Sequence, residues 1–283
     1  MHTHVEYSHA PSAVRFMTGA ILRGQRKGSL CALLSARWNS CRASQRQLVD
    51  FSALTGLNTG SHLPLLLPQV LGFRLNMAVL THPRFPLPIW NALQIRNDIT
   101  QHEPMPADAD YVVETSSQPP RILPKGLEID LRTTFESDGK LLWEGVNTFY
   151  YRGQFGPAEQ RAAGAASPTA PTSEIARWNS PTGGRMAMAR LTGDYNGIHL
   201  SDAYARAFGF TRAFPHPQLA AAHCMTRLAP ADAWPQRLRL WLKGQAPYGA
   251  ELRLRANLTS QQATFALFYE NDARPIMLGV RHS

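Results

Sequence analysis

The sequence predicts an α+β fold in which one long helix packs against a strongly curved antiparallel sheet, with this arrangement occurring twice. Three observations predict it. The apolar segments 68–80 and 217–228 both begin with Pro-Gln. Runs of alternating apolar and polar residues follow each segment. Finally, residues 54–63 (LTGLNTGSHL) and 191–200 (LTGDYNGIHL) share Leu, Thr, Gly, Gly, His and Leu at matching positions, which indicates an internal repeat.

The two apolar segments are the predicted central helices. Proline suits the first helical position, because the N–H that it lacks would have no partner there. Both segments are apolar around much of their circumference, which is typical of a helix enclosed by a sheet. We therefore expect one helix to begin at Pro68 and the other at Pro217.

The strands are predicted from alternation. In residues 126–135, Leu127, Ile129 and Leu131 alternate with charged residues. The sequence SDGK at 137–140 is typical of a hairpin turn. The other predicted strands are 141–153, 237–244, 251–258 and 264–271.

Length and composition indicate a soluble globular chain. It has 283 residues, 44% of them apolar and 17% charged, enough for one large or two ordinary domains. Residues 156–174 are rich in Ala, Pro, Ser and Thr and predict a linker between an N-terminal unit (1–155) and a C-terminal unit (175–283). The longest apolar stretch, 63–73, is too short for a transmembrane helix and contains two prolines, and the N-terminus lacks the pattern of an export signal.

The net charge and the cysteine content limit which partners and which cellular compartment are expected. A net charge of +9 could serve nucleic acid, a membrane surface or a small anionic partner, or only solubility. Outside RGQRKG (23–28), Lys and Arg are scattered, so neither nucleic acid nor a membrane is an expected partner. Cys31, Cys41 and Cys224 are odd in number and form no CxxC pair, which favours reduced thiols in a cytoplasm.

The second repeat copy, 191–200, contains Asp194, Asn196 and His199 between glycines. On a regular helix, residues five apart point about 140° away from each other, because each residue turns through about 100°. A turn is therefore needed to bring Asp194 and His199 together, and Gly-Asp and Asn-Gly are turn formers. The run is either a polar surface turn or helix cap, or a site where an acid and a base converge.

The first repeat copy has lost this polar set. Leu57 and Thr59 stand where the second copy has its aspartate and asparagine. His62 is retained without an acidic neighbour, and we interpret it as a relic.

The second copy and the residues after it resemble the MaoC-like family of hotdog-fold proteins, which includes (R)-specific enoyl-thioester hydratases (hydratase 2) and 3-hydroxyacyl dehydratases. The family motif is small-Gly-Asp-x-Asn-Pro-aliphatic-His, followed after five residues by a small residue. Here it stands at 192–199, followed by Ala205. The Gly-Phe-x-Arg run at 209–212 and His216 at the helix start also match the family. The resemblance covers about 175–283 well.

The likeness of the first half rests on the repeat and on the double-hotdog members of the family. The resemblance implies an α+β double hotdog, with two curved antiparallel sheets that each wrap a central helix. It also implies a degenerate site in 1–155 and a working site in 175–283.

The resemblance also implies roles for the motif residues. Asp194 and His199 are the expected catalytic pair, which holds one water or the substrate 3-hydroxyl. Asn196 fixes the loop or the water, or is only a turn former, and Gly193 belongs to the substrate-binding loop. His216 orients the start of the helix or lines the pocket. His223 is expected to be a core histidine.

The sequence departs from the family at Gly197, where the family has proline, and at Pro217, where it has glycine. In the family, the backbone N–H of that glycine points at the thioester carbonyl oxygen. Proline has no N–H. The unpaired amides of Gln218 and Leu219 at the helix N-terminus are the expected replacement.

The expected function is that of a hydro-lyase acting on fatty acyl thioesters: reversible syn hydration of trans-2-enoyl-CoA or acyl-carrier-protein thioesters to (3R)-3-hydroxyacyl thioesters. The alternatives are a non-catalytic acyl-thioester-binding hotdog protein and a hotdog thioesterase. No nucleotide cofactor or metal is expected, since the sequence has neither a Gly-rich phosphate loop after a strand nor HExxH spacing. The chain is expected to be a monomer or a homodimer of double-hotdog chains.

Overall fold

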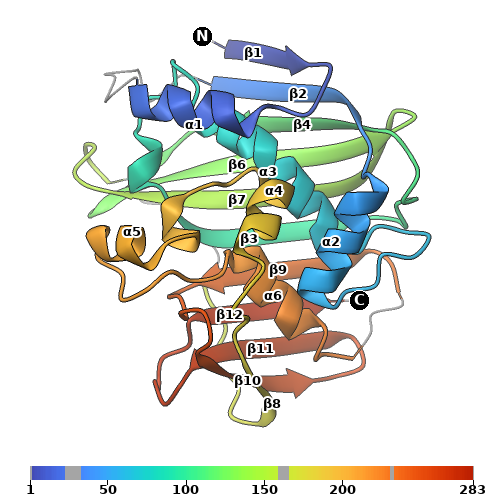
Figure 1. Cartoon of the computed structure of the whole chain (residues 1–283), viewed down its shortest axis with the longest axis vertical. Helices are drawn as coiled ribbons and strands as arrows, with labels where there is room; N and C mark the ends of the chain where they lie inside the picture. The colour runs from blue at the N-terminus through green and yellow to red at the C-terminus, as the bar shows by residue number, and fades with distance from the viewer. Residues whose placement is uncertain (1, 23–32, 159–165, 230–232, 283) are drawn as a thin grey trace.

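The computed structural model describes residues 2–22, 33–158, 166–229 and 233–282. The basic run at 23–28 and Cys31 lie outside these ranges. In the first half of the chain the elements are β1 (His2–Tyr7), α1 (Ala13–Leu22), β2 (Leu33–Cys41), α2 (Gln45–Thr55), α3 (Leu66–Leu80), η1 (Ile89–Asn91), β3 (Leu93–Gln101), β4 (Tyr111–Ser117), β5 (Arg121–Leu123), β6 (Gly126–Ser137) and β7 (Lys140–Arg152) (Figure 1).

The second half repeats much of this order with fewer strands. Its elements are β8 (Glu174–Asn179), α4 (Arg185–Thr192), η2 (Gly197–His199), α5 (Asp202–Ala207), α6 (Pro217–Met225), β9 (Gln236–Leu242), β10 (Glu251–Leu258), β11 (Gln262–Tyr269) and β12 (Met277–His282).

The strands form one curved twelve-stranded sheet in the order β1-β2-β4-β6-β7-β3-β9-β12-β11-β10-β8, with β5 paired to β6 off this path. Among the described strands, β1 and β2 are parallel and the other pairs are antiparallel. The predicted α+β class is confirmed. The sheets of the two halves are not separate, however, because β3 pairs with β9 and joins them edge to edge (Figure 1).

The two predicted central helices are α3 and α6, and they lie on the same side of the sheet (Figure 1). α6 begins at Pro217, as predicted. α3 begins at Leu66, two residues before the predicted start, and Pro68 lies in its first turn, where a missing N–H is tolerated. Arg74 is the one residue of α3 that is not buried. Close contact with the sheet requires Gly72, where a Cβ would lie 2.9 Å from Thr133 Cγ2.

The predicted strands are confirmed within two residues at each end. β6 and β7 form the predicted hairpin, and its turn residues Asp138 and Gly139 have φ of 51° and 74°, as a tight hairpin turn requires. Alternation predicted these strands because one face of each is buried. It missed the strands β1, β2, β3, β4, β5, β8 and β12.

A row of buried amides crosses from the helix of the first half to the helix of the second. Asn147 Nδ2 donates to Asn76 Oδ1 at 2.9 Å, and Asn97 Nδ2 donates to Asn147 Oδ1 at 2.8 Å. Gln218 Nε2 donates to Asn97 Oδ1 at 2.9 Å. Since a buried amide without a partner is costly, these bonds fix α3 and α6 relative to the centre of the sheet.

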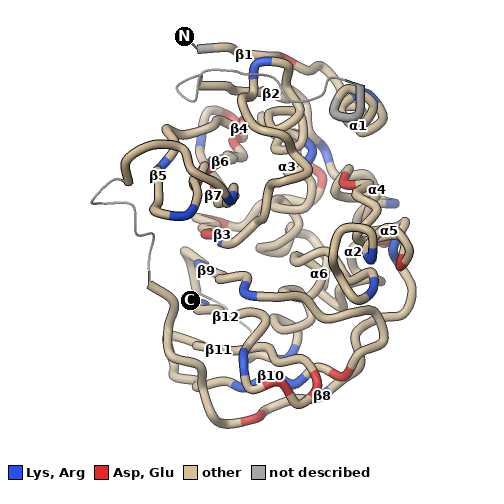
Figure 2. Tube along the Cα trace, turned by 90° about the vertical axis from the view of Figure 1, so that its left-hand side faces the viewer, with Lys and Arg blue, Asp and Glu red and all other residues tan. Residues whose placement is uncertain are grey.

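Charged residues of both signs are interspersed along the strands (Figure 2). Arg239 of β9 pairs with Asp98 of β3 at 2.6 Å across the junction of the two halves. Arg96 pairs with the buried Glu128 at 2.6 Å. Part of the positive charge is therefore neutralised on the sheet itself.

The predicted linker, 156–174, has neither helix nor strand at 156–158 and 166–173, and β8 begins at its last residue, Glu174. Residues 159–165 of the linker lie outside the described ranges. No described helix is long and apolar enough to cross a membrane.

Candidate active site

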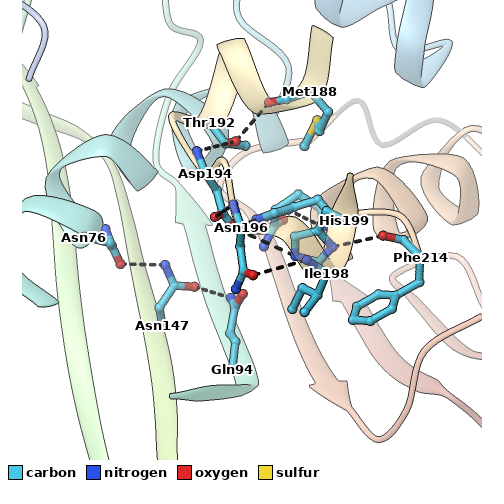
Figure 3. A network of polar contacts seen from close by, with 12 residues as sticks. Asn76, Gln94, Asn147, Met188, Thr192, Asp194, Asn196, Ile198, His199 and Phe214 are labelled. Atoms are coloured by element: carbon cyan, nitrogen blue, oxygen red, sulfur yellow. Dashed lines mark hydrogen bonds and ion pairs between the residues drawn. The ribbon is translucent and has the colours of Figure 1, made fainter. Parts of the chain in front are cut away.

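The loop after α4 folds around its own side chains. Gly193 ends the helix in a left-handed conformation with φ 74°, and the Asp194 N–H donates to Thr192 Oγ1 at 3.1 Å. Asp194 Oδ1 then accepts from the Asn196 N–H at 3.0 Å, and Asn196 Oδ1 accepts from the Ile198 N–H at 3.2 Å (Figure 3). These short-range bonds turn the chain within five residues, so the expected turn is confirmed and its own backbone orients the carboxylate.

His199 faces this carboxylate. Its Nδ1 lies 2.9 Å from the carbonyl oxygen of Phe214 (Figure 3). Its ring packs edge-on against the Phe214 ring, with 4.9 Å between the ring centroids. Because a carbonyl can only accept, Nδ1 carries a proton and Nε2 is the basic nitrogen of the neutral ring. Nε2 lies 3.8 Å from Asp194 Oδ2, and the two side chains are only 11% and 9% exposed.

His216 is the third group at the carboxylate. It caps α6, since its Nδ1 accepts from the Gln218 N–H at 3.3 Å. Its Nε2 lies 3.8 Å from Asp194 Oδ2, and its ring centroid is 5.4 Å from that of His199. Burial, and then the neighbouring His199, hold the pKa of His216 well below its usual value, so this ring is neutral.

A cavity of about 340 Å³ adjoins these three side chains. Its polar lining includes Asp194, Asn196, His199 and His216, and most of the remaining lining is apolar. Both halves contribute, because α3 lines one side of the cavity. The apolar residues include Phe73, Met77, Leu80, Ile89, Phe149 and Phe214.

Three of the expected substrate-binding residues do not line this cavity: Gly193, Gln218 and Leu219. Gly193 is the helix cap, and the Gln218 side chain belongs to the buried amide row. The expectation that the amides of Gln218 and Leu219 are unpaired is wrong. The N–H of Gln218 donates to His216 Nδ1, and the N–H of Leu219 donates to the carbonyl of His216 at 2.9 Å.

The sequence reasoning missed the contribution of the first half to the site. Arg74 of α3 donates to the carbonyl of Arg190 in the last turn of α4, and to the carbonyl of Pro11 at 3.4 Å. Its side chain also lies against Gly193. The available signal was a single charge in an otherwise uncharged predicted helix, which pointed to a specific partner.

The other histidines and cysteines that the structure describes do not line this cavity. His62 is exposed and bonded to Ser61, and His223 Nε2 lies 2.9 Å from the carbonyl of Leu54. Burial raises the pKa of both Cys41 and Cys224 to about 12, so these free thiols stay protonated. Within the described ranges, no three His, Cys, Asp or Glu residues are grouped so as to hold a metal ion.

No protein-family model matches the chain. A curated relative, 3-hydroxyacyl-thioester dehydratase X of Mycobacterium tuberculosis, is 27% identical over 189 residues, which cover 63% of this chain. The match spans 64% of that relative's length.

Two solved structures share the fold. The crystal structure of HtdX of Mycobacterium tuberculosis matches with a TM-score of 0.72 and 21% identity, over 87% of this chain and 98% of that chain. A MaoC-like dehydratase from Phytophthora capsici matches with a TM-score of 0.70 and 16% identity, over 89% and 93%. The chain therefore shares the fold of these two dehydratase structures and is similar in sequence to the curated dehydratase.

Proposed function

We propose that the chain catalyses the reversible syn hydration of trans-2-enoyl thioesters to (3R)-3-hydroxyacyl thioesters. One observation carries the proposal: Asp194 Oδ2 and His199 Nε2 are 3.8 Å apart, on the wall of an apolar cavity. This separation is too long for a hydrogen bond between them, yet one oxygen atom between them can lie about 2.8 Å from both.

The chemistry follows from this geometry. In hydration, one member of the pair takes a proton from water as the water oxygen bonds to C3, and the C2–C3 π electrons move toward the thioester carbonyl. The pair then delivers the proton taken from the water to C2, which restores its starting state. Because both groups approach from one side of the substrate, the addition is syn. Dehydration is the same path reversed, and the hydroxyl leaves C3 as water.

The acyl chain occupies the apolar part of the cavity, against Phe73 and Met77 of α3. A volume of about 340 Å³ lies within the range of small-molecule sites. The thioester is carried by coenzyme A or an acyl-carrier protein, and the net charge of +9 suits either of these acidic carriers. Neither nucleic acid nor a membrane belongs to this proposal.

The chain is a double hotdog in this proposal, with units at 1–155 and 175–283 and a linker between them. α3 and α6 as paired central helices support it. The first unit has no working site, since Leu57 packs against the core where the second unit has its aspartate. The fused units act as a monomer or a homodimer. The free buried thiols Cys41 and Cys224 favour a cytoplasmic location. The proposed reaction places the chain in fatty acid metabolism.

A non-catalytic acyl-thioester-binding protein is the second candidate. Pro217 has no N–H, and the amides of Gln218 and Leu219 are already bonded. A fold that keeps its pocket but lacks a donor to the thioester carbonyl would bind without turnover.

The test follows the absorbance of a conjugated enoyl thioester as water adds to it. Wild type is compared with Asp194→Asn and His199→Gln, and with His62→Gln as the matched control at the equivalent position of the first repeat copy. We expect turnover by wild type and by His62→Gln. The two site variants should fall by about 100-fold or more.

Each rival predicts a different result. A wild-type protein that binds the thioester without loss of the enoyl absorbance is a binding protein. Release of free thiol identifies a thioesterase. Equal loss of turnover in all three variants would contradict the assignment of the pair.

A further inference from the structure

The reaction proposed above places negative charge on the thioester carbonyl oxygen, and the first three residues of α6 provide no free backbone donor for it. Pro217 lacks an N–H. The N–H of Gln218 is bonded to His216 Nδ1, and the N–H of Leu219 to the carbonyl of His216. Losing such a donor costs about 100- to 1000-fold in rate, so an active enzyme needs one from elsewhere.

The hydrogen bonds of His216 fix which of its nitrogens carries the proton. Nδ1 accepts from a backbone N–H, so it holds a lone pair. In a neutral imidazole the proton is then on Nε2. That nitrogen lies 3.8 Å from Asp194 Oδ2, which is too far for a hydrogen bond between them, and both side chains line the cavity.

The surroundings of the ring keep it neutral and fixed. The side chain is 4% exposed and caps the N-terminus of α6, whose dipole disfavours a positive charge there. Phe73 packs edge-on against the ring with 5.1 Å between the ring centroids, and the centroid of the His199 ring lies 5.4 Å away. A neutral imidazole with a depressed pKa, held at a helix N-terminus, can polarise a substrate carbonyl in enzymes.

We propose that the Nε2–H of His216 donates a hydrogen bond to the thioester carbonyl oxygen and replaces the backbone amide that Pro217 cannot provide. As electrons move from C2 toward this oxygen, the bond strengthens, and the proton stays on His216. His216 is then a third catalytic residue. The inference rests on the proposed function, because it assigns the carbonyl donor of that same site.

Two substitutions separate the carbonyl donor from the helix cap. Asparagine is a good N-cap, so His216→Asn keeps the cap but is too short to bring a donor to the position of Nε2. His216→Gln is a poor cap, but its amide can reach that position. If His216 acts as the carbonyl donor, glutamine therefore partly restores this function and asparagine loses it. If His216 acts only as the helix cap, asparagine should preserve function better than glutamine.

The measurement uses a conjugated dienoyl-CoA bound to Asp194→Asn, which holds the thioester without turning it over. A hydrogen bond to the carbonyl draws electron density toward the oxygen and shifts the absorbance of the chromophore to longer wavelength. We expect this shift with His216 present, its loss in Asp194→Asn/His216→Asn, and partial return in Asp194→Asn/His216→Gln. Equilibrium dialysis checks that the ligand is bound, and circular dichroism checks the fold.

With Asp194 intact, we expect His216→Asn to reduce kcat/KM by about 100-fold or more and His216→Gln to reduce it less. A shift that persists in the folded asparagine variant overturns the inference. A higher activity of His216→Asn than of His216→Gln also overturns it, because that order is expected of a helix cap. If His216 only holds Asp194, activity falls while the shift remains, which also overturns it. Absence of wild-type turnover with a His216-dependent shift refutes the proposed function but leaves the carbonyl donor in place.

Discussion

Gly56 and Gly193 end α2 and α4 with the same left-handed backbone, at φ 74° in both. The residues before them, Thr55 and Thr192, also match: each hydroxyl donates to the carbonyl four residues earlier and accepts from the amide two residues later. The repeat therefore extends from the residue letters to individual hydrogen bonds. The two copies diverge at the next side chain, which is an aspartate only in the second.

This equivalence provides a matched pair of variants. A Cβ in the left-handed region costs about 1–2 kcal/mol, so Gly56→Ala and Gly193→Ala should each destabilise the protein by at least this amount. At Gly193 the added Cβ would also lie 2.9 Å from Arg74 Cγ, whereas at Gly56 its nearest contact is Thr226 Cγ2 at 3.4 Å. Only Gly193→Ala should displace the carboxylate, and we expect it alone to lower kcat by about 10- to 100-fold.

Thermal unfolding and hydratase assays on both variants check this. Similar losses of activity in the two would show that the loss follows stability and not the position of the loop.

Arg74 provides a second test of how the first half supports the site. Replacing it with methionine keeps the apolar stem but leaves the carbonyls of Arg190 and Pro11 without their donor. Because these carbonyls are exposed or only half-buried, losing the two bonds should cost about 1 kcal/mol of stability. We expect kcat to fall more than KM rises, because Arg74 does not line the cavity and the loop that carries Asp194 loses its anchor.

Arg190→Ala is the control, since it removes an exposed positive charge from α4 and leaves the carbonyl in place. Arg74→Lys should recover part of kcat. If Arg190→Ala loses as much kcat as Arg74→Met, net charge and not anchoring is responsible.

Local signals in the sequence were sufficient for part of the fold. The turn that brings Asp194 and His199 together is made by bonds within five residues, so glycine and asparagine preferences predicted it. The hairpin at Asp138 and Gly139 followed for the same reason. Pro217 marked the first residue of α6 because the fixed φ of proline suits that position.

The rest depended on contacts between distant residues. The junction of β3 and β9 pairs Ile99 with Leu238, and nothing in either segment alone specifies that partner. The amide of Gln218 was expected to be free because the general rule for helix ends leaves it so, but the side chain of His216 occupies it. His216 was expected to orient the helix start or line the pocket, and in the structure it does both.

The neutral His216 also predicts how stability depends on pH. Its folded pKa lies well below the unfolded value of about 6.5, because burial disfavours the charged ring. Above pH of about 6.5 both states are neutral, and stability does not change through this group. Below it the unfolded chain takes up a proton that the folded protein refuses, so the free energy of unfolding falls by up to about 1.4 kcal/mol per pH unit.

Urea unfolding between pH 5 and pH 7 measures this slope. The pKa of His223 is also lowered by burial, so His216→Asn should reduce the slope without abolishing it. An unchanged slope in His216→Asn would show that this ring is not the group responsible.

Met77 tests whether the acyl chain lies against the helix of the first half. Met77 is 4% exposed and lines the cavity, so Met77→Trp fills space that a long chain would use. Overpacking of this kind costs about 1–3 kcal/mol of stability, whereas Met77→Leu nearly conserves the volume and serves as the control. We expect kcat/KM of Met77→Trp to fall about tenfold or more for long-chain enoyl thioesters and to stay near wild type for a short one. A uniform loss over all chain lengths would place the acyl chain elsewhere, because filling its binding space selectively affects only those substrates long enough to reach α3.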